Sequence, residues 1–124
     1  MPHFIVEYFN KSNSNLTAEL IANAVYTAAC ECGLFSKEDI KIRAFCPDFV
    51  IFDSAAENHV HITVKLFSGR SKWQIAKMRE MIVHGVESLP ISSLALSVEI
   101  VSLTSDNYFK KILRQKEVSI MNQV

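Results

Sequence analysis

The two halves of this chain carry the same short sequence pattern, and this repeat constrains the fold more than any other feature. Residues 2–8 read PHFIVEY and residues 60–66 read VHITVKL. When His3 is placed over His61, apolar side chains occupy every second position of both segments. Strict alternation of this kind predicts two β-strands, each with one buried face.

Each predicted strand is followed by a segment with helical spacing of its apolar residues. In the first half the helix is expected to start after Asn15, a suitable N-cap, and to end at Gly33. In the second half Ser71 and Gln74 form the pattern of a capping box, and Pro90 stops the helix. The sequence therefore predicts one helix in each half.

A second strand completes each half, at about residues 40–45 and 94–101. Strand, helix and strand in this order form a βαβ unit. We therefore predict an α/β (α+β) fold, in which a duplicated βαβ unit gives a four-stranded sheet with two helices on one face. The 124 residues are expected to form one domain, with repeat halves at about 2–46 and 60–103 and a C-terminal tail at 104–124. The tail has no strong pattern and is expected to pack on a neighbouring subunit or to fray.

One layer of helices leaves the other face of the sheet uncovered. The side chains expected on this open face are His3, Ile5, Lys41, Arg43, Phe45, His61 and Thr63. The set is too mixed for a core and too apolar for a free surface, which favours a partner. Self-association is the simplest interpretation.

The totals exclude several classes of protein. Thirteen basic and thirteen acidic residues cancel, so no overall charge attracts nucleic acid or an anionic membrane. The first apolar run is short and reaches Glu7, unlike a secretory signal, and no segment is long enough to span a membrane. With Cys30, Cys32 and Cys46 expected as reduced thiols, we predict a cytoplasmic protein.

Pro2 is the first candidate for chemistry. A small residue after Met1 allows the methionine to be removed, which would leave the nitrogen of Pro2 as a secondary amine. An α-amine starts at a pKa of about 8, and burial or nearby cations would lower it. Such an amine can act as a general base near pH 7. The plainer interpretation is a proline that only begins a strand.

Lys41 and Arg43 are the second candidates, because residues two apart on a strand point the same way. Two cations side by side indicate an anion between them. That anion is either a bound carboxylate or an acidic side chain, for which Glu7, Glu99 and Asp48 are the possibilities.

Arg70 is the third candidate and lies in the turn Ser68-Gly69-Arg70-Ser71, between a strand and a capped helix. A helix N-terminus favours anions, and an arginine can bind a carboxylate through two hydrogen bonds. A solvated arginine in a turn is the alternative.

The remaining candidates carry less chemistry. His59 and His61 have no partner at metal-ligand spacing, and we expect them to pack or to form hydrogen bonds. Trp73 is expected in the core or in an interface. No metal-binding spacing and no glycine-rich phosphate loop occur, so no metal and no other cofactor are expected.

Five segments in order resemble the tautomerase superfamily, and within it the 5-carboxymethyl-2-hydroxymuconate isomerases. They are residues 2–7 (PHFIVE), 40–43 (IKIR), 60–65 (VHITVK), 69–71 (GRS) and 94–100 (LALSVEI). The resemblance implies a homotrimer and an isomerase that moves a proton, and with it a C=C bond, within an unsaturated 2-hydroxy or 2-oxo (di)acid.

The same resemblance implies roles for individual residues. Pro2 would be the catalytic base and acid, and Arg43 and Arg70 would bind the substrate. Lys41 stands where the family has a catalytic arginine; lysine keeps the charge but loses the planar two-point grip.

Two other functions remain open from the sequence. One is a non-catalytic trimer of the same fold that binds small acids or a protein. The other is an RNA-binding module of similar layout, which would need stacking aromatic side chains on the open face; Phe45 is one candidate.

Overall fold

The structure is a computed structural model that describes residues 1–11 and 15–114. Its elements in chain order are β1 (His3–Asn10), α1 (Ala18–Glu31), the short 3₁₀ helix η1 (Lys37–Asp39), β2 (Lys41–Phe45), β3 (Asn58–Phe67), α2 (Lys72–Glu87) and β4 (Leu94–Leu103). The order strand–helix–strand occurs twice, as the repeat predicts. The last part of the predicted tail, residues 115–124, lies outside the described residues.

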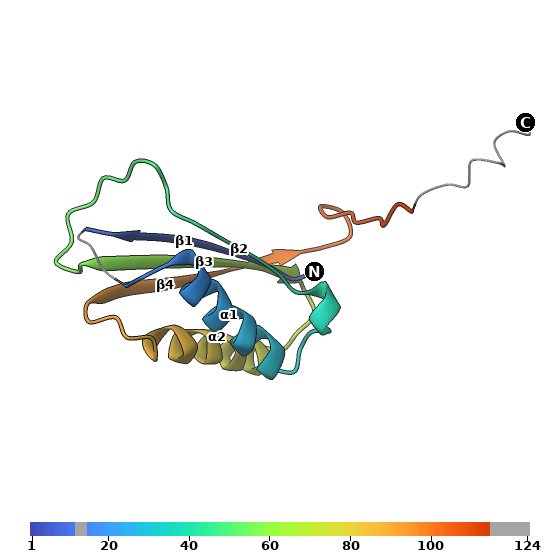
Figure 1. Cartoon of the computed structure of the whole chain (residues 1–124). Coiled ribbons are helices and arrows are strands. Elements are labelled where there is room, and N and C mark those ends of the chain that lie inside the picture. The colour runs from blue at the N-terminus through green and yellow to red at the C-terminus, as the bar shows by residue number, and fades with distance from the viewer. Residues whose placement is uncertain (12–14, 115–124) are drawn as a thin grey trace, which may run out of the picture.

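The four strands form one mixed sheet in the order β2-β1-β3-β4. The strands of each βαβ unit are parallel, whereas β1 and β3, which join the two units, are antiparallel. Both helices cover the same face of the sheet (Figure 1). The predicted fold is therefore confirmed.

The core lies between this sheet and the two helices. Alternate strand residues point into it, among them Phe4, Val6, Ile62 and Val64, and meet Ile21, Val25, Met78 and Ile82 of the helices. All eight are fully buried. Burying such a side chain contributes about 1.5–3 kcal/mol, so the period-two pattern of the sequence is also the main source of stability.

The helix ends agree with the sequence except at one N-terminus. The capping box of Ser71 and Gln74 is present, and Gly33 follows α1 with φ +78°, a conformation that favours glycine. The expectation that Asn15 caps α1 is wrong. Thr17 is the N-cap, and its side chain accepts a hydrogen bond from the Leu20 N–H at 3.2 Å. Asn15 lies two residues too early to reach the first turn.

The connection at residues 46–57 arches over the face of the sheet opposite the helices (Figure 1). Phe52 stacks on His59 with ring centroids 3.8 Å apart. Beneath the connection is a cavity of about 480 Å³, lined among others by Phe49, Phe52 and His61. This cavity lies toward the carboxyl end of β1, away from Pro2.

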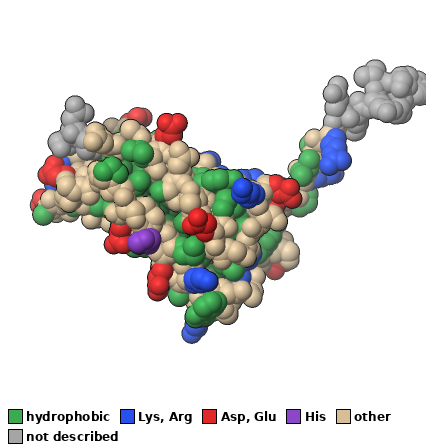
Figure 2. All heavy atoms as spheres, turned by 60° about the horizontal axis from the view of Figure 1, so that its bottom comes forward, with side chains coloured by type: hydrophobic (Ala, Val, Ile, Leu, Met, Phe, Trp, Pro, Cys, Tyr) green, Lys and Arg blue, Asp and Glu red, His purple; other side chains and the backbone are tan. Residues whose placement is uncertain are grey.

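The surface of the helical layer shows acidic and basic side chains interspersed, with no large region of one sign (Figure 2). Trp73 is 69% exposed and lies under the ammonium group of Lys77. Of the two positions predicted for it, the core is excluded and an interface stays a prediction. Cys30, Cys32 and Cys46 are free thiols, as expected. Of the helices in the described part of the chain, none combines the length and hydropathy that a membrane span requires.

Candidate active site

Pro2 lies at the amino end of β1, directly before the strand, and is fully buried. Because β1 is an inner strand, this end of the chain has β2 on one side and β3 on the other. The Lys41 N–H donates to the Pro2 carbonyl at 3.1 Å and extends the parallel pairing by one step. The backbone thus fixes where the nitrogen of residue 2 lies.

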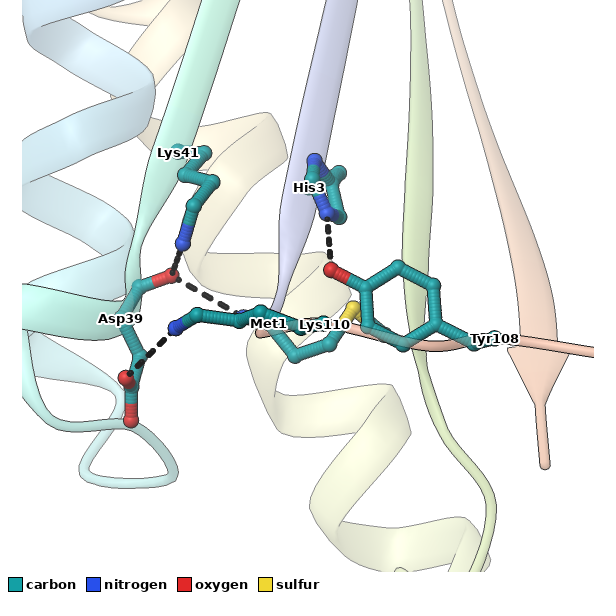
Figure 3. A network of polar contacts seen from close by, with 6 residues as sticks. All are labelled: Met1, His3, Asp39, Lys41, Tyr108 and Lys110. Atoms are coloured by element: carbon teal, nitrogen blue, oxygen red, sulfur yellow. Dashed lines mark hydrogen bonds and ion pairs between the residues drawn. The ribbon is translucent and has the colours of Figure 1, made fainter. Parts of the chain in front are cut away.

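The Met1 amine lies in a small polar network with Asp39, Lys41 and Lys110 (Figure 3). Both the Met1 amine, at 3.3 Å, and the Lys41 ammonium, at 3.2 Å, donate to the Asp39 carbonyl. The carboxylate of Asp39 forms an ion pair with Lys110 at 3.8 Å. Two lysines from distant parts of the chain therefore converge on the N-terminus.

This setting disfavours a charged amine. Burial, followed by the charges of Lys41 and Lys110, lowers the pKa of the Met1 amine below 8.0, and Asp39 opposes the shift. The sequence predicts burial and nearby cations around the nitrogen of Pro2. In the structure these surround the amine of Met1, the residue before it.

A cavity of about 520 Å³ opens at this position. It is lined by Met1, Asp39, Phe67, Ser105, Tyr108, Phe109 and Lys110. Four of these residues follow β4, so the start of the predicted tail folds back on its own chain. The tail was expected to pack on a neighbouring subunit or to fray, and contact of its first residues with the N-terminus of the same chain was not expected.

His3, the first residue of β1, connects Arg43 to Tyr108. The Arg43 Nη1 lies 3.1 Å from His3 Nδ1, and the Tyr108 hydroxyl lies 2.9 Å from His3 Nε2. Burial lowers the pKa of His3 first, and the charges of Arg43, the N-terminus, Lys41 and Lys65 lower it further. His3 is thus held as a neutral ring at neutral pH.

The acidic partners considered for Lys41 and Arg43 do not pair with them. Among the described residues, no ion pair includes either cation, and Glu99 pairs with His61 at 3.1 Å instead. His61 also contacts the Ser97 hydroxyl at 2.7 Å, so the expectation of hydrogen bonding for this histidine is confirmed.

Arg70 is not part of the same cluster. Its guanidinium donates to the carbonyls of Phe67, at 3.1 Å, and Leu34, at 3.3 Å, and lies over the ring of Phe35. It lines a separate cavity of about 580 Å³ with Lys72 and Arg79. The structure brings Pro2, Lys41 and Arg43 together at one end of the sheet and turns Arg70 toward the end of α1.

Sequence reasoning missed Asp39, Tyr108 and Lys110. Two of them, Tyr108 and Lys110, follow β4, and the predicted order and direction of the strands could have placed them near the N-terminus. Because β4 is parallel to β3 and β3 is antiparallel to β1, the chain that leaves β4 emerges beside the start of β1. In the described ranges, no group of three or more His, Cys, Asp or Glu side chains is placed to hold a metal ion.

One comparison with known proteins identifies a family. The family model described as 5-carboxymethyl-2-hydroxymuconate isomerase matches residues 2–116. Comparison with curated protein sequences finds no significant match.

Solved structures with the same fold include two whose descriptions match that of the family model. A 5-carboxymethyl-2-hydroxymuconate delta-isomerase has a TM-score of 0.74 and 14% identity, over 94% of this chain and 95% of the other. A 5-carboxymethyl-2-hydroxymuconate isomerase from Deinococcus radiodurans R1 has a TM-score of 0.69 and 19% identity, over 89% and 88%. The "W0 fused 4-OT wild type symmetric trimer" has a TM-score of 0.65 and 14% identity, over 88% and 93%. These likenesses show the fold.

Proposed function

This chain belongs to the 5-carboxymethyl-2-hydroxymuconate isomerase family, and from that premise we propose that it is an isomerase of the tautomerase type. Its substrate is an unsaturated 2-hydroxy or 2-oxo acid. The substrate that the family description names carries more than one carboxylate, so a diacid is the first choice. Pro2 is the general base and acid once Met1 has been removed. The observation that carries the proposal is the amino terminus held between Lys41 and Lys110 at a cavity.

The state of the base follows from its surroundings. Removal of Met1 would turn the Pro2 nitrogen from an amide into a secondary amine at the same end of β1. The two lysines that lower the pKa of the Met1 amine would face this nitrogen as well. A neutral amine near pH 7 accepts a proton readily and returns it with little cost. Removal of Met1 would also vacate part of the cavity that it lines.

The proposed reaction moves one proton and, with it, the double bonds of the conjugated acid. The Pro2 nitrogen takes a proton from one position of the conjugated acid, and the double bonds shift as negative charge collects on the oxygen at carbon 2. The protonated nitrogen then delivers its proton to another carbon of the same conjugated chain. No electron is gained or lost overall, so the step needs no redox partner.

The cations have separate proposed roles. Lys41 is the cation nearest the amine and stabilises the oxygen that gains charge. Arg43, on the same face of β2, holds a carboxylate. We retain Arg70 as the cation for a distal carboxylate, because Phe67 lines both the cavity of Arg70 and the cavity at the N-terminus.

A homotrimer is part of the proposal. The open face carries Ile5 and Phe45, the latter 46% exposed, and would be covered by neighbouring copies. One structural neighbour is described as a symmetric trimer, which supports this arrangement for the fold.

The test compares proteins whose N-terminus has been verified by mass spectrometry. Ketonisation of a 2-hydroxydienoate is followed by ultraviolet absorbance for the wild type, Pro2→Ala and the control Pro90→Ala. Loss of the secondary amine should reduce kcat/KM by about 10²- to 10⁴-fold, whereas the control should stay near the wild type. Equal activity of Pro2→Ala and the wild type would exclude the proposed base.

A second candidate is a non-catalytic protein that binds small acids. It is favoured by Lys41, which keeps the charge of an arginine but loses the planar two-point grip. It would also follow if Met1 were retained, because the Pro2 nitrogen would then belong to a peptide bond. An amide nitrogen has no basic lone pair. Native protein that retains Met1, shows no turnover and still binds a 2-oxo acid would establish this alternative.

A further inference from the structure

The turn after β4 brings the chain back toward the start of β1. The Asn107 side-chain oxygen accepts a hydrogen bond from the Thr104 N–H at 2.8 Å, and the Asn107 N–H donates to the Thr104 carbonyl at 3.1 Å. These two bonds close the turn from both sides. Tyr108 is the first residue after it, so the turn fixes where this side chain begins.

The ring of Tyr108 is held in place by two neighbours. It packs edge-on against Phe67, with centroids 5.5 Å apart, and against His3, with centroids 5.6 Å apart. Its hydroxyl lies 2.9 Å from His3 Nε2, and the residue lines the cavity that contains Met1 (Figure 3). The hydroxyl is therefore ordered at the edge of the space where the reaction is proposed.

The direction of the hydrogen bonds follows from the chemistry of arginine. A guanidinium only donates, so Arg43 Nη1 donates to His3 Nδ1, which then carries no hydrogen. In the neutral ring the hydrogen is on Nε2 and is donated to the Tyr108 oxygen. The hydroxyl hydrogen of Tyr108 must then point away from His3.

We propose that Tyr108 donates this O–H to an oxygen of the bound acid, and that His3, oriented by Arg43, is the positioning residue that directs it. The inference deepens the proposed function and rests on it. A donor fixed in advance favours an oxygen that becomes more negative during the reaction, which is the oxygen at carbon 2. It would also discriminate against analogues without an acceptor at that position.

The charges around His3 support the neutral ring that this arrangement needs. Arg43 and Lys41 face it from β2, Lys65 from β3, and the amino terminus from β1, and burial adds to their effect. All of these lower the pKa of His3, and the Tyr108 hydroxyl lies at the other ring nitrogen. The lowered pKa of His3 therefore favours the neutral ring, and with it this hydrogen-bond order, at pH 7.

The first experiment removes only the hydroxyl. Tyr108→Phe keeps the ring contacts with Phe67, and Tyr26→Phe on α1 is the matched control, since Tyr26 lies on the opposite side of the sheet. We expect Tyr108→Phe to reduce kcat/KM for a 2-hydroxydienoate by about 10- to 100-fold, with only a small fall in the urea midpoint, because the hydrogen bond from His3 is lost. The control should not change either quantity.

The second experiment reads the positioning directly and needs no substrate. Nitrogen-15 NMR of the His3 ring at pH 7 should show a bare Nδ1 and a protonated Nε2 in the wild type. Arg43→Ala should allow both tautomers, because Nδ1 loses its donor. A charged ring, or a hydrogen on Nδ1 in the wild type, would overturn the inference.

The outcomes separate this inference from the proposed function. If Pro2→Ala abolishes turnover while Tyr108→Phe matches the wild type, the base stands and the role of Tyr108 is overturned. If the wild type without Met1 has no turnover, the proposed isomerase activity is excluded. Binding of 2-oxohexanedioate then tests the role of the Tyr108 hydroxyl. Weaker binding by Tyr108→Phe, by about tenfold, would support the hydroxyl as a donor, and equal binding would overturn it.

Discussion

At the scale of single residues, the candidate site depends on charges that come from distant parts of the sequence. Lys41 begins β2, whereas Lys110 follows β4, yet both lower the pKa of the amine at the start of β1. Lys41 acts through its charge and a hydrogen bond, whereas Lys110 acts through its charge alone, because a partly buried charge acts over several ångströms. The basicity of this amine is therefore a property of the folded chain.

Removing one of these charges should be visible in the pH dependence of the enzyme. Lys110→Ala removes a cation and leaves the Asp39 carboxylate unpaired, and both changes raise the pKa of the amine. A smaller fraction of the amine is then neutral at pH 7, so the acidic limb of the kcat/KM profile should move to higher pH.

The neighbouring Lys111→Ala is the control for this measurement. Lys111 does not contribute to the lowered pKa of the amine and should leave the limb in place. A Lys110→Ala profile that coincides with that of Lys111→Ala would show that Lys110 does not act on the base.

At the scale of elements, the sequence predicts the architecture well because each strand and helix has its own period. The capping box at Ser71 is a local pattern, and it appears in the structure as expected. The sequence offers Asn15 as the cap of α1, but Thr17 caps it, because both residue types can cap and local sequence alone does not select the first turn. Tyr108 and Lys110 were missed because no periodicity extends beyond β4.

The capping box offers a test of how much one local pattern contributes. Ser71→Ala removes the acceptor for the Gln74 N–H, a bond of 3.1 Å, and should lower the free energy of unfolding by about 1 kcal/mol. Urea denaturation measures this change. Ser68→Ala in the same turn is the control and should stay within a few tenths of a kcal/mol; an equal loss in both variants would contradict the role of the cap.

At the scale of the whole molecule, the two faces of the sheet differ in what covers them. The helices bury one face within the chain, and the other keeps Phe45 half-exposed beside the loop residues Phe49 and Ile51, which are 79% and 83% exposed. A protein of this size rarely leaves such a surface free, which is why we expect copies of the chain to cover it.

Light scattering coupled to size exclusion should therefore give about three times the chain mass of 14.0 kDa. Phe45→Glu places a charge on the open face and should shift the protein toward the monomer. Trp73→Glu, on the helical layer, is the matched control and should leave the assembly unchanged. Dissociation by Trp73→Glu alone would assign the interface to the other side of the molecule.

The position of Pro2 also has a practical consequence for anyone who expresses this protein. Pro2 is fully buried at the start of an inner strand, and the residue before it lines the cavity that Tyr108 also lines. An affinity tag fused ahead of Pro2 would leave an amide there and thread foreign polypeptide through the reaction space. With Pro2 as the proposed base, a recombinant protein purified in that way should show no isomerase activity, even where the protein with a free Pro2 amine is active.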